Sequence, residues 1–252
     1  MIHFVGAGCG AADLITVRGK SLLESADVII YAGSLVNPDL LSCAKDDCRV
    51  YNSAEMTLEE VLQVMYDAEA EGLDTVRLHT GDPCLYGAIR EQMDALDSKG
   101  FEYDCCPGVS AFCGAAASLK MEYTLPEISQ SVVITRMAGR TPVPDRESIR
   151  SFAMHRATMV LFLSAGLLDQ VTEELVEGGY PPDTPAAIVY KATWPDEKTY
   201  LCTVESLAGC AKDNHVTKTA LIIVGDAVDQ SGYARSRLYH PDFTTEFRQG
   251  RH

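Results

Sequence analysis

The chain has 252 residues, of which 46% are hydrophobic, and a formal net charge of −15. This length suffices for one large domain or two small ones with their own cores, and the acidic balance argues against nucleic acid as a partner. All apolar stretches are far shorter than the roughly 20 residues of a membrane-spanning helix, so no membrane partner is expected. The first residues lack the pattern of a secretory signal, which predicts a cytoplasmic location.

Patterns typical of strands and helices alternate through the first half of the chain. This α/β rhythm predicts a mostly parallel sheet. A strand at Ile2–Gly6 leads through a Gly-rich turn into an amphipathic stretch at 14–25. The predicted elements that follow are a strand at Val28–Tyr31, a helix at 57–71 closed by Gly72, a strand at Thr75–His79, a helix at 88–98 closed by Gly100, and a short strand near Tyr103.

The stretch Tyr123-Thr124-Leu125-Pro126-Glu127 interrupts this rhythm, and we place a domain boundary near residue 128. The two expected domains are therefore residues 1–127 and 128–252. The second domain is expected to hold strands at 132–135, 159–163, 187–190, 199–203 and 221–224 and helices at 167–177 and 204–211, in a mixed sheet. The tail after Val228 is polar and lacks periodicity.

The negative charge is unevenly spread along the chain. Residues 1–110 carry 7 basic and 19 acidic groups, a net charge of −12. The stretch from Lys120 to Arg156 is instead rich in arginine. This second region is expected to receive a polyanionic small molecule.

Three glycine-containing loops each follow a predicted strand or lead into a helix. The first is Gly6-Ala7-Gly8-Cys9-Gly10, the second is Thr80-Gly81-Asp82-Pro83, and the third is Cys106-Pro107-Gly108-Val109-Ser110-Ala111. Loops after parallel strands meet at the carboxyl edge of the sheet, where open α/β sheets bind their ligands. Taken alone, the first loop is also compatible with a dinucleotide site, or with a plain tight turn. The strand at Val28–Tyr31 ends without the acidic residue that would bind a ribose.

No motif for a metal or for a nucleophile is found in the sequence. The nine cysteines form no Cys-x-x-Cys pair, and the six histidines show no ligand spacing, so we expect no metal site. A Ser-His-Asp elbow and a Walker loop are also missing.

These loops, together with Gly87 and the stretch 187–193, resemble the tetrapyrrole methylase superfamily in order and spacing over nearly the whole chain. Two longer runs look like the precorrin-4 C11-methyltransferase branch of that superfamily. They are Tyr31-Ala32-Gly33-Ser34-Leu35-Val36-Asn37-Pro38, and Thr124-Leu125-Pro126-Glu127-Ile128-Ser129-Gln130 continuing through Thr135-Arg136 to Gly139-Arg140-Thr141-Pro142-Val143-Pro144.

The resemblance implies a homodimer of two α/β domains, with S-adenosylmethionine in the cleft between them and a tetrapyrrole in an adjoining trough. The implied activity is methylation of C11 of precorrin-4 or cobalt-precorrin-4 in cobalamin biosynthesis, with S-adenosylhomocysteine as the second product. The implied cofactor contacts, many of them through backbone atoms, are Cys9, Thr80, Gly81, Asp82, Leu85, Ser110, Ala111, Leu163, Ala192, Thr219 and Ala220.

The chain departs from the wider superfamily at two positions. Many relatives have proline where Cys9 stands, which puts the shape of that turn in question. Relatives that methylate uroporphyrinogen have an aspartate, proposed as a base, where Ala32 stands. A base is therefore not assigned to this position.

Methyl transfer from a sulfonium to carbon mainly requires alignment of the reactants and exclusion of water. No catalytic side chain is assigned, and the residue that handles the released proton stays open among Asp82, Glu127 and Tyr190. The acetate and propionate groups of a tetrapyrrole would seek Arg136, Arg140 and Arg146, of which Arg136 is the strongest candidate. Each of these arginines could equally be a solvated surface charge.

Three alternative functions stay open at this point. A nicotinamide-dependent oxidoreductase would use the first glycine loop. A tetrapyrrole carrier or sensor would have kept the fold without the reaction. A sister methylase would act at another ring carbon or on a substrate that is not a tetrapyrrole.

Overall fold

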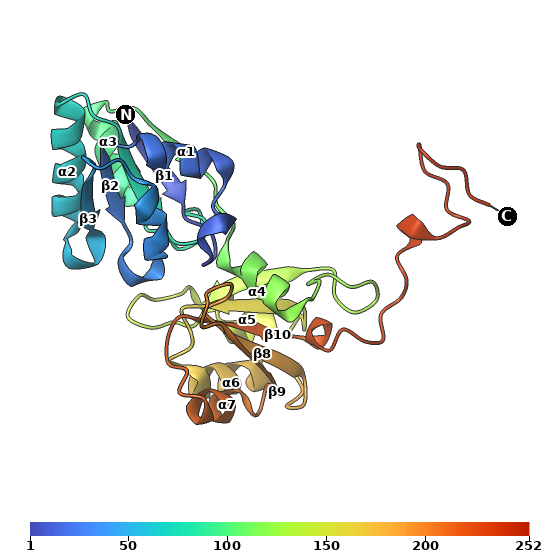
Figure 1. Ribbon diagram of the computed structural model, residues 1–252. Helices are drawn as coiled ribbons and strands as arrows, with labels where there is room; N and C mark the ends of the chain where they lie inside the picture. Colours follow the sequence, from blue (N-terminus) through green and yellow to red (C-terminus); the bar gives the residue numbers. More distant parts are fainter. Residues whose placement is uncertain (252) are drawn as a thin grey trace. The chain divides into compact units, whose positions relative to one another are not determined.

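The computed structural model describes residues 1–251, which form two compact units (Figure 1). The first unit comprises Met1–Ala115 together with Lys191–Glu197, a segment from the second half of the chain. The second unit comprises Ala116–Tyr190 and the chain from Lys198 onward. Within residues 1–251, no helix is both long enough and apolar enough to span a membrane.

The first unit is built on a parallel sheet of five strands in the order β3-β2-β4-β1-β5. The predicted parallel sheet is thereby confirmed. Its strands are β1 (Ile2–Gly6), β2 (Val28–Tyr31), β3 (Arg49–Asn52), β4 (Thr75–His79) and β5 (Tyr103–Cys106).

Helices cover both faces of this sheet, as buried parallel strands require. On one face, α2 (Leu58–Ala70) and α3 (Arg90–Lys99) pack in a core around Phe4 and Ile30. On the other face, Leu23 of α1 (Val17–Ser25) packs in a core with Val5 and Leu78. The sheet is therefore a rigid frame for the loops at its ends.

The strand order places a topological switch point between two neighbouring strands. After β1 the chain continues into α1 on one face, whereas after β4 it continues into α3 on the opposite face. Because β1 and β4 are paired in parallel, with Gly6 beside His79, both loops leave the sheet at the same carboxyl edge before the chain continues to opposite faces. Open α/β sheets bind ligands at such a point.

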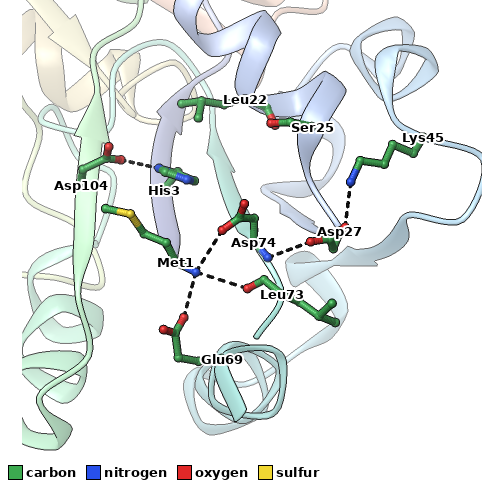
Figure 2. A network of polar contacts seen from close by, with 10 residues as sticks. All are labelled: Met1, His3, Leu22, Ser25, Asp27, Lys45, Glu69, Leu73, Asp74 and Asp104. Carbon is green, nitrogen blue, oxygen red and sulfur yellow. Dashed lines mark hydrogen bonds and ion pairs between the residues drawn. The ribbon is translucent and has the colours of Figure 1, made fainter. Parts of the chain in front are cut away.

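The opposite, amino edge of the same sheet carries a network of charged side chains (Figure 2). The amino group of Met1 lies 3.1 Å from carboxylate oxygens of both Glu69 and Asp74. Asp27 pairs with Lys45 at 2.7 Å and accepts a hydrogen bond from the backbone N–H of Asp74 at 2.9 Å. Side chains thus secure the strand ends at this edge.

The second unit contains a mixed sheet in the order β6-β7-β10-β8-β9, which confirms the predicted mixed sheet. Its strands β6 and β7 are parallel, and the remaining pairs are antiparallel. Three helices share one buried core with the sheet. The elements are β6 (Val132–Arg136), α5 (Ile149–Ala153), β7 (Thr158–Phe162), α6 (Leu168–Glu177), β8 (Pro185–Tyr190), β9 (Lys198–Thr203), α7 (Leu207–Asp213) and β10 (Ala220–Val224).

Helix boundaries differ from the sequence predictions where local backbone geometry intervenes. Of the predicted stretch 14–25, Leu14 ends a 3₁₀ turn at Ala12–Leu14, and helix α1 begins only after Thr16, whose side chain caps it. Helix α3 begins at Arg90 because Ala88 has a left-handed backbone, with φ of 50°. The predicted helix at 57–71 is confirmed as α2, with a capping box between Thr57 and Glu60.

Candidate functional site

The loops after β1 and β4 are joined directly by their backbones at the switch point. The N–H of Gly81 donates to the carbonyl of Gly8 at 2.9 Å, and the N–H of Gly8 donates to the carbonyl of Gly81 at 3.3 Å. Both glycines have positive φ, 84° for Gly8 and 62° for Gly81. Glycine adopts this conformation without steric cost, which explains its presence at both positions.

The third loop packs so closely on the first two that a side chain would not fit. A β-carbon added to Gly108 would lie 2.2 Å from the carbonyl oxygen of Gly81, and one added to Gly6 would lie 2.5 Å from the α-carbon of Gly108. Real β-carbons do not approach other atoms this closely. The three glycine loops therefore form one interlocked layer at the carboxyl edge.

Asp82 fastens this layer through both of its carboxylate oxygens. Its Oδ1 accepts a hydrogen bond from the N–H of Cys84 at 2.8 Å, and its Oδ2 accepts one from the N–H of Gly108 at 3.0 Å. Burial acts to raise the pKa of Asp82, but the hydrogen bonds from Cys84 and Gly108 outweigh it and lower that pKa overall. The carboxylate thus joins the second and third loops.

A fourth part of the layer comes from the segment Lys191–Glu197, which belongs to the first unit. A β-carbon added to Gly10 would lie 2.5 Å from the carbonyl oxygen of Ala192 and 2.4 Å from Cδ1 of Trp194. Lys191 and Thr193 have left-handed backbones, with φ of 48° and 66°. Such conformations cost about 1 to 3 kcal/mol each and gather at functional sites.

Two buried polar atoms at the end of β4 have no protein partner. Among residues 1–251, Oγ1 of Thr80 and Nε2 of His79 are buried without a hydrogen bond. Unpaired polar atoms of this kind are uncommon in folded proteins. A polar ligand or a water molecule at this edge would satisfy the hydroxyl of Thr80.

His79 itself is a packed side chain. It is 4% exposed, and its ring lies 6.2 Å from the ring of Phe4 in a stacked arrangement. Burial, together with the nearby charge of Arg77, lowers the pKa of His79 to about 3. The imidazole is therefore neutral at neutral pH.

Arg77 and Gln92 hold the loop before α3 through hydrogen bonds, and neither role was predicted from the sequence. The guanidinium of Arg77 donates to Oε1 of Gln92 at 3.2 Å and to the carbonyl of Ile30 at 3.1 Å. Gln92 in turn donates to the carbonyl of Ala88 at 2.9 Å. This chain of bonds ties the strained loop before α3 to the centre of the sheet. No pattern in the sequence marks an arginine in a buried strand for this role.

Eight of the positions expected to contact the cofactor belong to the first unit and gather on these loops. Cys9 is buried, and its Sγ would lie 2.8 Å from a β-carbon added to Gly114 in α4 (Ala111–Leu119). The N–H of Leu85 donates to the carbonyl of Asp82 at 3.2 Å. The eight positions are Cys9, Thr80, Gly81, Asp82, Leu85, Ser110, Ala111 and Ala192.

The other three expected contacts lie in the second unit, at one edge of its sheet. Leu163 directly follows β7, is 69% exposed and has φ of 51°. Thr219, with φ of 55°, directly precedes β10, which starts at Ala220. Because β7 and β10 are antiparallel, with Leu161 opposite Ile222, the end of β7 and the start of β10 meet at this edge.

The three expected substrate arginines have different surroundings. Arg136 ends β6, and its guanidinium donates to the carbonyls of Met137, Thr141 and Pro142, so it organises the loop that follows. Arg140 is exposed within that loop. Arg146 is also exposed and lies 3.4 Å from Glu147. In the part of the chain described, Arg136 is thus the only one of the three whose guanidinium is fixed by several backbone carbonyls.

The described residues contain no group of three or more His, Cys, Asp or Glu side chains that could hold a metal ion. All nine cysteines are free. The three glycine loops themselves consist mainly of backbone and small side chains joined by the Asp82 carboxylate, which suits a ligand held by close approach.

Comparison with known proteins identifies the family of the chain. The family model of Tetrapyrrole (Corrin/Porphyrin) Methylases matches residues 1–208. A cobalt-precorrin-4 C(11)-methyltransferase of Methanocaldococcus jannaschii is 51% identical over 98% of this chain and 96% of its own length. Curated relatives of both kinds, cobalt-precorrin-4 and precorrin-4 C(11)-methyltransferases, match at 41–51% identity.

Solved structures with a similar fold are also tetrapyrrole methyltransferases. The X-ray structure of a cobalt precorrin-4 methyltransferase, a cobalamin biosynthetic enzyme, is 45% identical with a TM-score of 0.88, covering 90% of this chain and 95% of that one. A uroporphyrin-III C-methyltransferase from Thermus thermophilus, solved with S-adenosylhomocysteine, is 25% identical with a TM-score of 0.78, covering 91% of this chain and 99% of that one. The chain belongs to the tetrapyrrole methylase family.

Proposed function

We propose that the chain is an S-adenosylmethionine-dependent methyltransferase that methylates C11 of precorrin-4 or cobalt-precorrin-4 in cobalamin biosynthesis. The observation that carries this proposal is the identity of 51% over nearly the full length of a relative with that activity. The expected fold of one parallel and one mixed sheet accompanies it. The nicotinamide alternative is disfavoured because β2 runs into Ala32 and Gly33, with no acidic residue to bind a ribose.

We infer that S-adenosylmethionine binds at the glycine-loop layer. The residues present fit it: glycines let the backbones of the three loops pack closely, and the buried hydroxyl of Thr80 lacks a protein partner among the residues described. The residues that would hold it are those carried over from the family, namely Cys9, Thr80, Gly81, Asp82, Leu85, Ser110, Ala111 and Ala192, with Leu163, Thr219 and Ala220 of the second unit.

The chemistry leaves the protein mainly a positioning role. When bound, S-adenosylmethionine supplies a methyl group already activated by its sulfonium, and S-adenosylhomocysteine is the product after transfer. Alignment of two reactants can supply about 7 to 11 kcal/mol of the barrier. Asp82 contributes by fixing the loops, because both of its oxygens are engaged by backbone N–H groups. We assign no general base.

The tetrapyrrole, by this proposal, is held through its acidic side groups by Arg136, with Arg140 and Arg146 as further candidates. Arg136 retains the charge that such groups would seek, while its bonds to three carbonyls fix the loop 137–142. We further propose a cytoplasmic homodimer; the dimer rests on the family resemblance. Light scattering should then give twice the chain mass of 27.4 kDa. The proposed division into domains 1–127 and 128–252 rests on the break in the alternation of strands and helices at 123–127, and it differs from the two compact units, whose bounds are at Ala115/Ala116 with Lys191–Glu197 added to the first.

The activity is tested with S-adenosylmethionine that carries an isotopically labelled methyl group. The purified chain is incubated with precorrin-4 and, separately, with cobalt-precorrin-4, and the products are examined by mass spectrometry and NMR. One labelled methyl group at C11 is the expected result. The substrate that is methylated faster shows whether the enzyme acts on the ring with or without cobalt. A label at another ring carbon, or none with either substrate, would overturn the proposal.

A further inference from the structure

One peptide group of the first glycine loop is held at both of its ends. The carbonyl of Gly10 and the N–H of Ala11 belong to the same peptide bond. The side-chain amide of Asn37 donates to the carbonyl of Gly10 at 2.9 Å. The hydroxyl of Thr193 accepts a hydrogen bond from the N–H of Ala11 at 3.0 Å. Two side chains that are 156 residues apart in sequence therefore secure one peptide plane.

We infer that Asn37 and Thr193 are positioning residues that together fix the Gly10–Ala11 peptide and thereby the cofactor-binding turn. The inference rests on the proposed function, because it assumes that this turn contacts S-adenosylmethionine. Neither residue is among the expected cofactor contacts. Asn37 lies within the run 31–38, and Thr193 lies in the segment that packs on Gly10.

The turn needs such support because of its composition. Gly6, Gly8 and Gly10 alternate in it, and glycine restricts the backbone least of all residues. Gly10 has φ of 155°, and the approach of Ala192 and Trp194 leaves no room for a side chain that would stiffen it. Hydrogen bonds at both ends of the peptide restrict its rotation without adding bulk. A ligand that meets an already ordered turn loses less entropy on binding.

Thr193 is itself firmly held. Its hydroxyl donates to the Sγ of Cys9 at 3.6 Å, so the same group that accepts from Ala11 also orients the cysteine of the turn. Its backbone N–H donates to the carboxylate of Glu197, and the N–H of Trp194 donates to the carbonyl of Lys191 at 3.0 Å. The left-handed backbone of Thr193 is thus kept in place by bonds within its own segment.

Asn37 is held in the same way on the other side. It is 7% exposed, and its Oδ1 accepts a hydrogen bond from the N–H of Asp39 at 3.0 Å. This contact identifies the oxygen of the side-chain amide and leaves the nitrogen facing Gly10. The orientation of the donor is therefore fixed before any ligand arrives.

The inference is tested by calorimetric titration with S-adenosylhomocysteine. Thr193→Val keeps the shape of the side chain but removes the hydroxyl, and Asn37→Ser keeps a cap for Asp39 but does not reach Gly10. Each variant is expected to raise the Kd about tenfold, because one hydrogen bond to the Gly10–Ala11 peptide is lost, buried for Asn37 and partly buried for Thr193. Thr193→Ser, which retains the hydroxyl, is expected to stay within about threefold, and Thr199→Val, an exposed matched control on β9, to show no change.

The double variant Thr193→Val with Asn37→Ser distinguishes a shared peptide from two separate structural roles. Once one bond is lost the peptide can turn, so the second loss is expected to add much less than another factor of ten. Amide exchange at Ala11 should accelerate in both single variants. Should Thr193→Val fail to fold, Asn37→Ser and its exchange rate test the same peptide from the other end.

The outcomes separate the inference from the proposed function. Wild-type binding of S-adenosylhomocysteine with unchanged affinity in both single variants, or with multiplicative losses in the double variant, would overturn the inference alone. A wild-type chain that does not bind S-adenosylhomocysteine would overturn the proposed cofactor site, whatever the amide exchange at Ala11 shows.

Discussion

The amino and carboxyl edges of the parallel sheet are held together by different kinds of contact. At the amino edge, charged side chains pair across the strand ends, as Asp27 does with Lys45 (Figure 2). At the carboxyl edge, the loops bond through their backbones, as Gly8 does with Gly81, and glycines allow contacts that side chains would prevent. Surface ion pairs contribute little and tolerate change. Close backbone packing tolerates almost none, so the carboxyl edge is where substitutions should affect binding.

The largest effect is expected from Gly108→Ala. The added methyl group would lie 2.2 Å from the carbonyl oxygen of Gly81, so the loops must separate. We expect the affinity for S-adenosylhomocysteine to fall more than about 100-fold, measured by calorimetry. The control is Gly72→Ala at the amino side of β4, where nothing lies within 4 Å and only the positive φ of 72° is strained. It should cost about 1 kcal/mol of stability and spare binding. Equal loss of binding in both variants would remove the distinction between the edges.

The next effect is expected from Asp82→Asn, with Asp74→Asn as its partner at the other end of β4. An amide in place of the Asp82 carboxylate brings an NH₂ group toward one of the two backbone N–H donors. We expect a loss of S-adenosylhomocysteine affinity of about tenfold. Asp74 contacts the amino group of Met1 at the opposite edge, and its variant should bind normally.

The stability difference between wild type and Asp82→Asn is expected to depend on pH. The hydrogen bonds to Asp82 lower its pKa in the folded chain. The stability that its carboxylate contributes is therefore present above its unfolded pKa of about 4 and is lost as the pH falls through the lower folded pKa. Thermal unfolding of wild type and Asp82→Asn should differ at neutral pH and converge in acid. A difference that persists or grows in acid would contradict the assignment.

Arg136→Ala sharpens the comparison in a different way, because it separates the two ligands. The substitution removes the charge and frees the loop 137–142 in the second unit. We expect the KM for the tetrapyrrole to rise about tenfold, while the affinity for S-adenosylhomocysteine changes less than about twofold. Steady-state kinetics and calorimetry measure the two quantities. Parallel loss of both would assign Arg136 to the general fold.

The smallest effect is expected from Lys45→Ala at the amino edge. The pair with Asp27 is short, at 2.7 Å, but Lys45 is exposed and Asp27 is partly exposed. We expect the unfolding midpoint to change by no more than about 2 °C and binding to stay the same. A loss of affinity would show that the amino edge also shapes the site.

Most of the fold follows from the sequence because hydrophobic period and glycine position report local structure directly. The strand at Thr75–His79 and the helix after Thr57 were predicted from these signals and are present. The strand Arg49–Asn52 was missed because it is an edge strand with exposed residues, which leaves no buried run to recognise. Helix α5 was missed because it has only five residues.

The site was predictable only as a set of loops. Gly6–Gly10 and Thr80–Asp82 are recognisable because glycine and Asp-Pro indicate a turn between a predicted strand and a helix. The contacts of Asn37 with Gly10 and of Thr193 with Ala11 join distant stretches of chain, and no local pattern encodes them. The inclusion of Lys191–Glu197 in the first unit is likewise a tertiary fact. Buried partners such as Arg77 and Gln92 escape sequence analysis for the same reason.

The most direct test of the account is calorimetric titration of the purified chain with S-adenosylhomocysteine, using NADH as the control ligand. The account predicts micromolar binding of S-adenosylhomocysteine, loss of that binding in Gly108→Ala, and no heat from NADH. Binding of NADH alone would contradict it and assign the glycine loops to a nicotinamide cofactor.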